Sequence, residues 1–259
     1  MGTILFDSVV FGPVKSRRLG NSLGINLLPN DSKLCNYNCV YCECGWTLHT
    51  HQSRKKFHSS TTVLDALEEK LKSMTYLNEV PDSLTFAGNG EPTLHPDFSE
   101  IIAGVLALRD EYFREAKVAV LSNGTMIHKD KVFEALSRAD RIMLKLDSAI
   151  EETYALINAH PKGFGLQKLI NNLERFKGNF IIQSLFLTGK RDGIRIDNTA
   201  EEELEAWIEM LDKLNPLEVH IYSLARETPS SELQAVSAEK LQEIGRRLEG
   251  KKFKTFVFS

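Results

Sequence analysis

Short apolar stretches alternate along the chain with longer segments in which apolar residues recur every three or four positions. The short stretches predict strands at 22–28, 83–87, 117–122, 141–146, 180–187 and 218–223. The periodic segments predict helices at 63–74, 98–108, 131–137, 150–157, 166–176 and 201–214. Strands that alternate with helices favour a parallel sheet joined by right-handed crossovers. We therefore predict an α/β fold, built as an open, incomplete (βα)6 barrel.

The pattern continues more weakly beyond the sixth predicted strand. One more helix, 238–248, and a short strand, 253–258, follow it. We expect residues 1–226 to form the core and residues 227–259 to form a short helix–strand appendage at its C-terminal side. A chain of 259 residues is long enough for one α/β barrel domain with a sizeable apolar core.

Composition narrows the class of protein. The chain is 42% hydrophobic and 26% charged, and its formal net charge is −3, which excludes a global attraction to nucleic acid or anionic membranes. The first residues, MGTILFDSVVFGPVKSRR, do not have the pattern of a signal peptide, and no apolar run predicts a membrane span. All four cysteines lie between positions 35 and 44, unlike a disulfide framework, so we expect a cytoplasmic protein.

Three of these cysteines, Cys35, Cys39 and Cys42, have the spacing C-x3-C-x2-C in a polar segment. Clustered thiolates suit an iron–sulfur cluster or zinc. Three thiolates leave one iron of a four-iron cluster open for another ligand, whereas structural zinc normally has four protein ligands. A zinc-stabilised binding module is therefore the alternative of a different class. Three residues could supply its fourth ligand: Cys44, His49 and His51.

With Tyr41 before the last cysteine, segment 35–42 resembles the signature of the radical S-adenosylmethionine (SAM) superfamily. The resemblance implies that Cys35, Cys39 and Cys42 bind a 4Fe–4S cluster, with SAM on the open iron. It further implies a partial TIM barrel and a Tyr41 ring packed against adenine. SAM would be cleaved to a 5′-deoxyadenosyl radical that abstracts hydrogen from an unidentified substrate. An electron donor of the flavodoxin or ferredoxin type would supply the electron.

Two loops extend this resemblance, because parallel barrels bind ligands where their strands end. The second predicted strand ends in G-N-G-E-P, which is similar to the G-G-E segment of the superfamily with Asn89 in place of one glycine. The third predicted strand ends in S-N-G. This segment is either a plain turn or, as the resemblance implies, the position that contacts the ribose of SAM. The resemblance implies SAM contacts from these residues: Gly88, Asn89, Gly90, Glu91, Ser122 and Asn123. We expect Gly90→Val to weaken SAM binding and leave the cluster intact.

The fourth predicted strand contains Lys145 and Asp147, which are two positions apart and so share one face. Charges that face a barrel interior are rare unless they are paired or belong to a site. The pair is either a structural ion pair or, as the resemblance implies, part of the SAM site.

Later strands contribute candidates for the substrate side of the site. Gln183, His220 and Tyr222 could face inward, with Arg226 and Glu227 in the loop beyond. A lone histidine on a strand is more often a structural core residue. We keep His220, Tyr222 and Arg226 as catalytic candidates and assign no catalytic role.

Within the superfamily, residues 20–226 resemble a group of small Fe–S oxidoreductases related to the wyosine-tRNA synthesis enzymes. The segments RIMLKLD, EVHIYSLARETP and G-N-G-E-P carry this likeness, and a tRNA-modifying enzyme is a further alternative. The chain lacks a recognisable nucleic-acid module, so we predict weak or no tRNA binding, and a small molecule or a protein segment as substrate.

Two short basic runs flank the cysteine segment: Lys15, Arg17 and Arg18, and Arg54, Lys55 and Lys56. Both could lie around the mouth of the barrel. For the first run we favour a solvated loop over an anion contact near the site.

Overall fold

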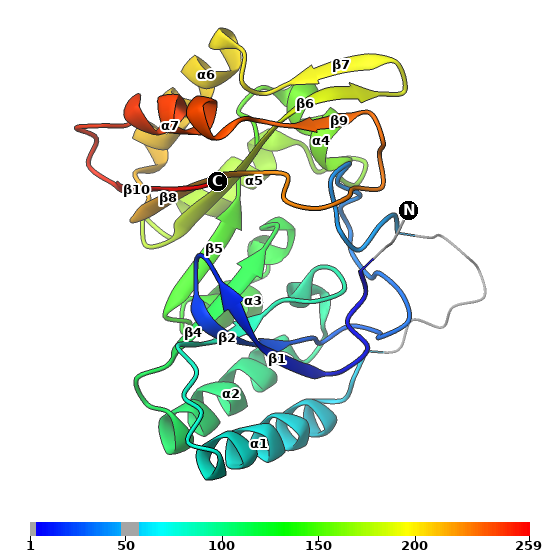
Figure 1. Cartoon of the computed structure of the whole chain (residues 1–259), viewed down its shortest axis with the longest axis vertical. Helices are drawn as coiled ribbons and strands as arrows, with labels where there is room; N and C mark the ends of the chain where they lie inside the picture. The colour runs from blue at the N-terminus through cyan, green and yellow to red at the C-terminus, as the bar shows by residue number, and fades with distance from the viewer. Residues whose placement is uncertain (1–3, 48–56) are drawn as a thin grey trace.

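A curved, mostly parallel sheet forms the centre of the protein (Figure 1). The computed structural model describes residues 4–47 and 57–259. Seven strands run parallel, in this order across the sheet: β2 (Gly20–Ile25), β3 (Ser83–Phe86), β4 (Lys117–Ser122), β5 (Arg141–Lys145), β6 (Ile181–Arg191), β8 (Glu218–Ser223) and β10 (Lys254–Phe258). The predicted α/β fold, a partial barrel, is confirmed.

The helices lie on the outer side of this sheet (Figure 1). They are α1 (Ser60–Tyr76), α2 (Phe98–Tyr112), α3 (Asp130–Leu136), α4 (Glu151–Asn158), α5 (Leu166–Glu174), α6 (Glu201–Leu214) and α7 (Ala238–Arg246), with short 3-10 turns η1 (Pro92–Leu94) and η2 (Thr125–His128). None of the helices in the described part of the chain is both long and apolar enough to cross a membrane.

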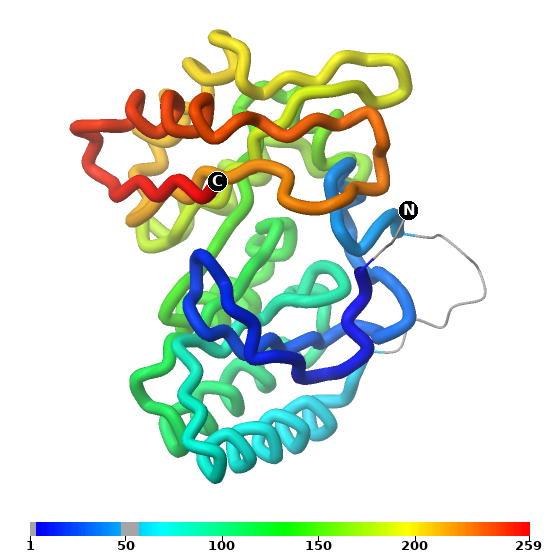
Figure 2. Tube along the Cα trace, in the orientation of Figure 1, coloured from blue at the N-terminus to red at the C-terminus, as the bar shows by residue number. Residues whose placement is uncertain are grey.

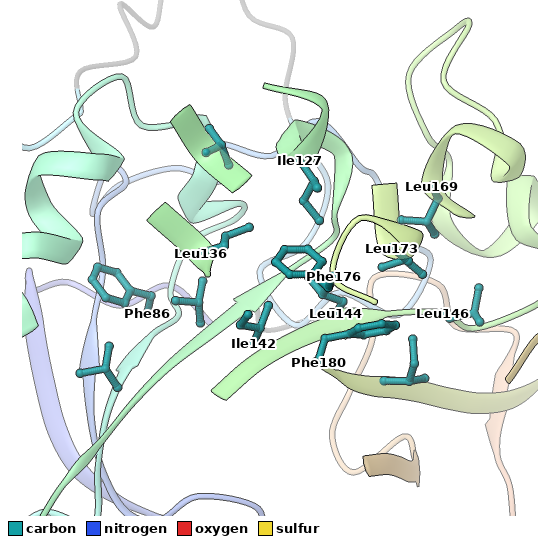
Figure 3. Packing of buried hydrophobic residues seen from close by; sticks show 14 of the residues in the cluster. Phe86, Ile127, Leu136, Ile142, Leu144, Leu146, Leu169, Leu173, Phe176 and Phe180 are labelled. Atoms are coloured by element: carbon teal, nitrogen blue, oxygen red, sulfur yellow. The ribbon is translucent and has the colours of Figure 1, made fainter. Parts of the chain in front are cut away.

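The two faces of the sheet differ in polarity, as the alternation of side chains along a strand requires. The outward residues, such as Leu84 and Phe86 of β3, belong to the main apolar core beneath the helices. Figure 3 shows Phe86, Ile142 and Leu144 of the sheet packed near Leu136 of α3. The inward face has two smaller apolar groups. One is centred on Ala119, Met143 and Ile181, and the other includes Leu185 and Leu187 of β6. The rest of the inward face is free to carry polar side chains.

Three strands of the structure were not predicted from the sequence. β1 (Val10–Ser16) pairs antiparallel with β2, but its sequence VFGPVKS has no regular alternation. β6 extends to Arg191 and forms a hairpin with β7 (Ile194–Asp197), and Asp192 and Gly193 form the turn with φ of 51° and 78°. Asp-Gly between two strands is a strong hairpin signal, so this hairpin was readable from the sequence. β9 (Leu233–Ala235) is short and pairs antiparallel with β6.

Residues 227–259 continue the sheet. β10 pairs in parallel with β8, from Lys254 beside Glu218 to Phe258 beside Tyr222. α7 precedes it and contributes Leu241 and Ile244 to the main core. We propose that this segment is an extension of the core rather than a separate domain.

One buried side chain joins the loop after β5 to the middle of β6. Asn198, 1% exposed, follows β7. Its Nδ2 donates to the main-chain oxygens of Asp147 at 2.7 Å and Leu185 at 2.8 Å, and its Oδ1 accepts from the amide of Leu187 at 2.8 Å. The amide therefore holds the loop after β5 against β6.

Replacing Asn198 by alanine removes all three hydrogen bonds that its side chain makes to the main chain. Each such loss costs roughly 1–3 kcal/mol, so we expect Asn198→Ala to lower the free energy of unfolding by about 3 kcal/mol. Urea denaturation measures the effect. Asn171→Ala is the control, because Asn171 lies exposed on α5, and an equal loss in both variants would contradict this role of Asn198.

Candidate active site

A cavity of about 250 Å³ lies inside the sheet, near the carboxyl ends of β3, β4 and β5. It brings together residues that are far apart in the sequence. Its lining consists of Arg18, Lys33, Cys35, Tyr37, Cys39, Tyr41, Cys42, Cys44, Gly88, Gly90, Glu91, Leu121, Ser122, Asn123, Lys145, Gln183 and Tyr222. The cavity thus contains the three signature cysteines and residues of each loop singled out from the sequence.

The cysteine segment is held in place from two sides. On one side, the amide of Leu34 donates to the main-chain oxygen of Asn89 at 2.8 Å, and the amide of Glu91 donates to that of Leu34 at 3.1 Å. On the other side, the amide of Val40 donates to the main-chain oxygen of Ile157 at the end of α4, at 2.9 Å. Figure 2 shows this segment, in light blue, reaching the green trace of that helix. A stretch without regular structure is therefore fixed by main-chain bonds.

The three cysteine sulfurs differ in their surroundings. Cys35 Sγ accepts from the amide of Tyr37 at 3.4 Å and from Nδ2 of Asn123 at 3.8 Å. Burial raises the pKa of Cys35 to about 12 and the pKa of Cys39 to about 11. The hydrogen bond from Cys44 outweighs burial at Cys42 and lowers the pKa of that thiol to about 6. Hydrogen-bond donors around cysteine sulfur are a feature of iron–sulfur sites, so these residues fit such a cluster.

Cys44 lines the same cavity as the other three. Its Sγ donates to the main-chain oxygen of Gly88 at 3.5 Å, and its hydrogen bond to Cys42 raises the pKa of Cys44. Among residues 4–47 and 57–259, no three Cys, His, Asp or Glu side chains gather closely enough to hold a single metal ion. His49 and His51 lie outside the described residues.

Lys33 is a site residue that sequence analysis missed. It is 4% exposed, and its Nζ donates to the main-chain oxygen of Gly45 at 2.8 Å. The positive charge acts to lower the pKa of all four cysteines. Lys33 therefore favours the thiolate form that metal binding needs. The only signal in the sequence was its position two residues before Cys35.

The glycine-rich loop after β3 faces the cavity with its backbone. Gly90 has a φ of +139°, and a Cβ built on it would overlap the main-chain oxygen of Leu34. Asn89 is fully buried and does not line the cavity. Its side chain bonds the main chain of Phe6 in both directions at 2.9 Å and donates to the oxygen of Pro29 at 2.8 Å. Asn89 thus ties this loop to the N-terminal segment.

Glu91 connects the glycine-rich loop to the loop after β4. Its carboxylate accepts from Ser122 Oγ at 2.8 Å, from the amide of Asn123 at 2.7 Å, and from the amide and hydroxyl of Thr93. Burial raises the pKa of Glu91, although these four donors oppose the shift. Asn123 Nδ2 in turn donates to Oδ1 of Asn36 at 2.8 Å, beside the first cysteine. The three loops therefore form one hydrogen-bonded unit.

Tyr41 and Lys145, which line the cavity, form a second polar group with the buried Asp147. The hydroxyl of Tyr41 donates to Asp147 Oδ2 at 2.6 Å and bonds Lys145 Nζ, which lies 4.4 Å from the centre of the tyrosine ring. Lys145 Nζ is also 3.2 Å from Asp147 Oδ2. Burial favours the neutral amine, but Asp147 outweighs it and raises the pKa of Lys145, so the lysine is charged. This group orients the ring of Tyr41 next to the signature cysteines.

Comparison with known proteins agrees with this geometry. A family model described as the radical SAM superfamily matches residues 30–201. The chain belongs to the radical SAM superfamily. It is 32% identical to a UPF0026 protein of Methanocaldococcus jannaschii over 87% of this chain and 65% of that protein. It is also 32% identical to the GTPase Obg of Brachyspira hyodysenteriae over 90% of this chain but only 32% of that protein. The chain therefore spans between about a third and two thirds of these relatives.

Solved structures of radical SAM enzymes share the fold. A radical SAM methyltransferase from Sphaerobacter thermophilus matches with a TM-score of 0.67 at 14% identity, over 92% of this chain and 65% of that chain. TYW1 with a lysine–pyruvate adduct matches with a TM-score of 0.63 at 15% identity, over 89% of this chain and 73% of that chain. The predicted superfamily is thereby confirmed, and the likeness to a wyosine-synthesis enzyme is confirmed at the level of the fold. Radical SAM enzymes bind a 4Fe–4S cluster and SAM and require a reductant.

The substrate-side candidates of this radical SAM chain do not all meet in the cavity. Gln183 and Tyr222 line it, but His220 does not. His220 is 1% exposed, its Nε2 lies 2.9 Å from Glu218 Oε2, and burial lowers its pKa. It therefore has the surroundings of a neutral core histidine.

The loop beyond β8 lies outside the cavity that holds the cysteines. Its Arg226 forms an ion pair with Glu43 at 2.6 Å. Arg226 and Glu227 together line a separate hollow at the surface. Of the three catalytic candidates, only Tyr222 therefore borders the cysteine cavity.

The position of Gly90 changes the effect expected of a substitution there. A Cβ would meet the main chain next to Cys35 rather than only the SAM side, so we expect Gly90→Ala to reduce iron content after reconstitution by more than about half and to destabilise the fold. Gly193→Ala is the matched control, because Gly193 also has a positive φ but open space around it. Iron analysis and thermal unfolding measure both. Full iron content in Gly90→Ala would contradict the close contact.

Proposed function

We propose that this chain is a radical SAM enzyme in which Cys35, Cys39 and Cys42 hold the 4Fe–4S cluster. The observation that carries the proposal is the shared cavity, which contains all three cysteines and the loops after β3 and β4. When bound, the cluster and SAM supply a 5′-deoxyadenosyl radical, which removes a hydrogen atom from the substrate.

The residues around the cysteines have distinct roles in this proposal. Lys33 supplies positive charge to the thiolates, and Asn123 donates to Cys35. Such donors and charges tune an iron–sulfur centre and stabilise its ligands. Glu91 positions Ser122 and Asn123, because its carboxylate already accepts bonds from both. Its contribution to SAM binding is therefore one of positioning.

SAM contacts come, in this proposal, from the backbone of Gly88 and Gly90 and from Ser122, Asn123 and Lys145, all of which line the cavity. Asp147 acts through Lys145 and Tyr41, which it holds by hydrogen bonds. The ring of Tyr41 is held beside Cys42 for contact with adenine. A protein of the flavodoxin or ferredoxin type is the proposed electron donor, and a small molecule or a protein segment is the proposed substrate.

The cysteines test this proposal directly. Anaerobic reconstitution of the wild type is expected to yield about four irons and four sulfides per chain. Cys35→Ala, Cys39→Ala and Cys42→Ala should each lose the brown cluster and most of this iron, because three thiolates are the minimum set. Cys44→Ala is the matched control and should keep iron and colour. Iron loss in Cys44→Ala equal to that of the other three would overturn the assignment, and zinc without sulfide would favour the binding module.

The basic run near residue 17 presents two exposed cations, Lys15 and Arg17, which is few for a polyanion. Arg17 also donates to the main-chain oxygen of Ser259 at 2.6 Å, and Arg18 lines the cavity. The second run, Arg54 to Lys56, lies outside the described residues.

We therefore expect no tight complex with tRNA at physiological salt, since nucleic-acid affinity rests on many phosphate contacts. Gel-shift titration with total tRNA measures this. Tight binding of one tRNA that disappears when Arg54, Lys55 and Lys56 are neutralised would contradict the expectation and favour a tRNA-modifying enzyme.

A further inference from the structure

A second cavity of about 260 Å³ adjoins the one that holds the cysteines. The two share four lining residues, Arg18, Tyr41, Cys42 and Tyr222. The second cavity contains no residue of the glycine-rich loop or of the loop after β4. It therefore leads away from the proposed SAM side of the site, toward Leu185 of β6 and the loop after β8.

Arg18 lies at the junction of the two cavities. It belongs to the turn between β1 and β2, and its amide and that of Leu19 donate to Ser16 Oγ at 3.3 Å and 3.2 Å. Its guanidinium carbon lies 4.5 Å from the centre of the Tyr222 ring. The turn and the ring together fix the side chain where the cavities meet. A guanidinium stacked on an aromatic ring keeps its N–H groups free to bond in its own plane.

The guanidinium of Arg18 has unused hydrogen-bonding capacity. Its Nη1 is buried and has no hydrogen-bond partner among residues 4–47 and 57–259. A buried donor is costly to leave without a partner, so a ligand that accepts from it gains a corresponding advantage. The ion pairs within these residues do not involve Arg18.

The carboxylates near the two cavities already have partners. Glu43 pairs with Arg226 at 2.6 Å, and Glu91 accepts four hydrogen bonds from its own loops. Asp147 pairs with Lys145. Arg18 therefore lacks an acidic partner in the described part of the chain. The positive charge of Arg18 at the junction of the two cavities is therefore available to bind an anion.

We propose that Arg18 forms a subsite for a carboxylate or phosphate group of the substrate, with Tyr222 as its support. This assignment rests on the proposed function, because it places the substrate in the second cavity beside the cluster ligand Cys42. A planar guanidinium matches the two oxygens of such a group, and its charge is poorly screened inside the protein. The substrate is therefore an anionic molecule, or a protein segment with an acidic group.

Inorganic phosphate and succinate serve as probes of the two anion classes. We expect both to bind reconstituted, SAM-saturated protein. Phosphorus NMR measures the binding of phosphate, and calorimetry measures the binding of succinate. Arg18→Gln should weaken this binding at least ~10-fold, the loss expected for a charge-assisted pair. Arg18→Lys should retain part of it. Lys15→Gln is the matched control, because Lys15 is an exposed cation on β1 outside both cavities.

Calorimetry with SAM shows whether the anionic group that Arg18 binds belongs to the substrate or to SAM. Unchanged SAM affinity in Arg18→Gln, together with weaker anion binding, would support a substrate subsite. An equal loss of SAM affinity would mean that Arg18 binds the carboxylate of SAM, and would overturn the proposal. Anion binding that is absent in the wild type, or unaffected by Arg18→Gln, would overturn it as well.

A measurement on the wild type alone covers the case in which the Arg18 variants fail to fold. Reducing the cluster makes it paramagnetic, so phosphate bound beside Cys42 should relax faster, and an unchanged relaxation rate would refute the subsite. The outcomes also separate this proposal from the proposed function. A protein that binds no iron or SAM refutes the proposed function, whereas normal iron and SAM binding with no anion effect refutes only the subsite.

Discussion

The pairing of Leu34 with Gly90 is the contact on which the candidate site depends. Two main-chain hydrogen bonds join the residue before Cys35 to the loop after β3. The cysteine segment has no regular structure of its own, so this pairing fixes where its sulfurs lie relative to the sheet. It requires a residue without a side chain at position 90, since a Cβ would overlap the oxygen of Leu34. The glycine is needed for the cysteines as much as for any ligand.

Much of the fold was readable from hydrophobic periodicity, and the reasons for the exceptions are physical. The strands β3, β4 and β5 are covered by helices on one face and by the interior of the barrel on the other. Their sequences are therefore short and apolar, which makes them easy to recognise as strands. β1 is an edge strand that includes Pro13, which donates no hydrogen bond and interrupts alternation. The strand β10 was predicted, but its place beside β8 was not, because pairing between distant segments leaves no local signal.

Some residues of the candidate site could likewise be predicted from local sequence patterns, and others could not. Cysteine spacing and the G-N-G-E-P and K-L-D segments are local patterns, and the structure places residues of all of them around one cavity. Arg18 and Lys33 reach that cavity from segments whose sequences resemble ordinary polar loops. Sequence analysis favoured a solvated loop for Arg18, since nothing local shows that a turn between two strands faces the interior. His220 shows the reverse, because alternation placed it on the same face as Tyr222 but did not give its depth.

The division of charge inside the sheet gives the site its chemical character. The buried carboxylates Glu91 and Asp147 are held by named donors, so their role is to fix loops. The buried Lys33 lines the same cavity as the cysteines, and the half-buried Arg18 lies at the junction of the two cavities. Because charge without water nearby is weakly screened, an excess of positive groups favours thiolates, an anionic cluster and an anionic ligand at once. The same electrostatic arrangement therefore supports both proposals, the cluster at the cysteines and the anionic subsite at Arg18.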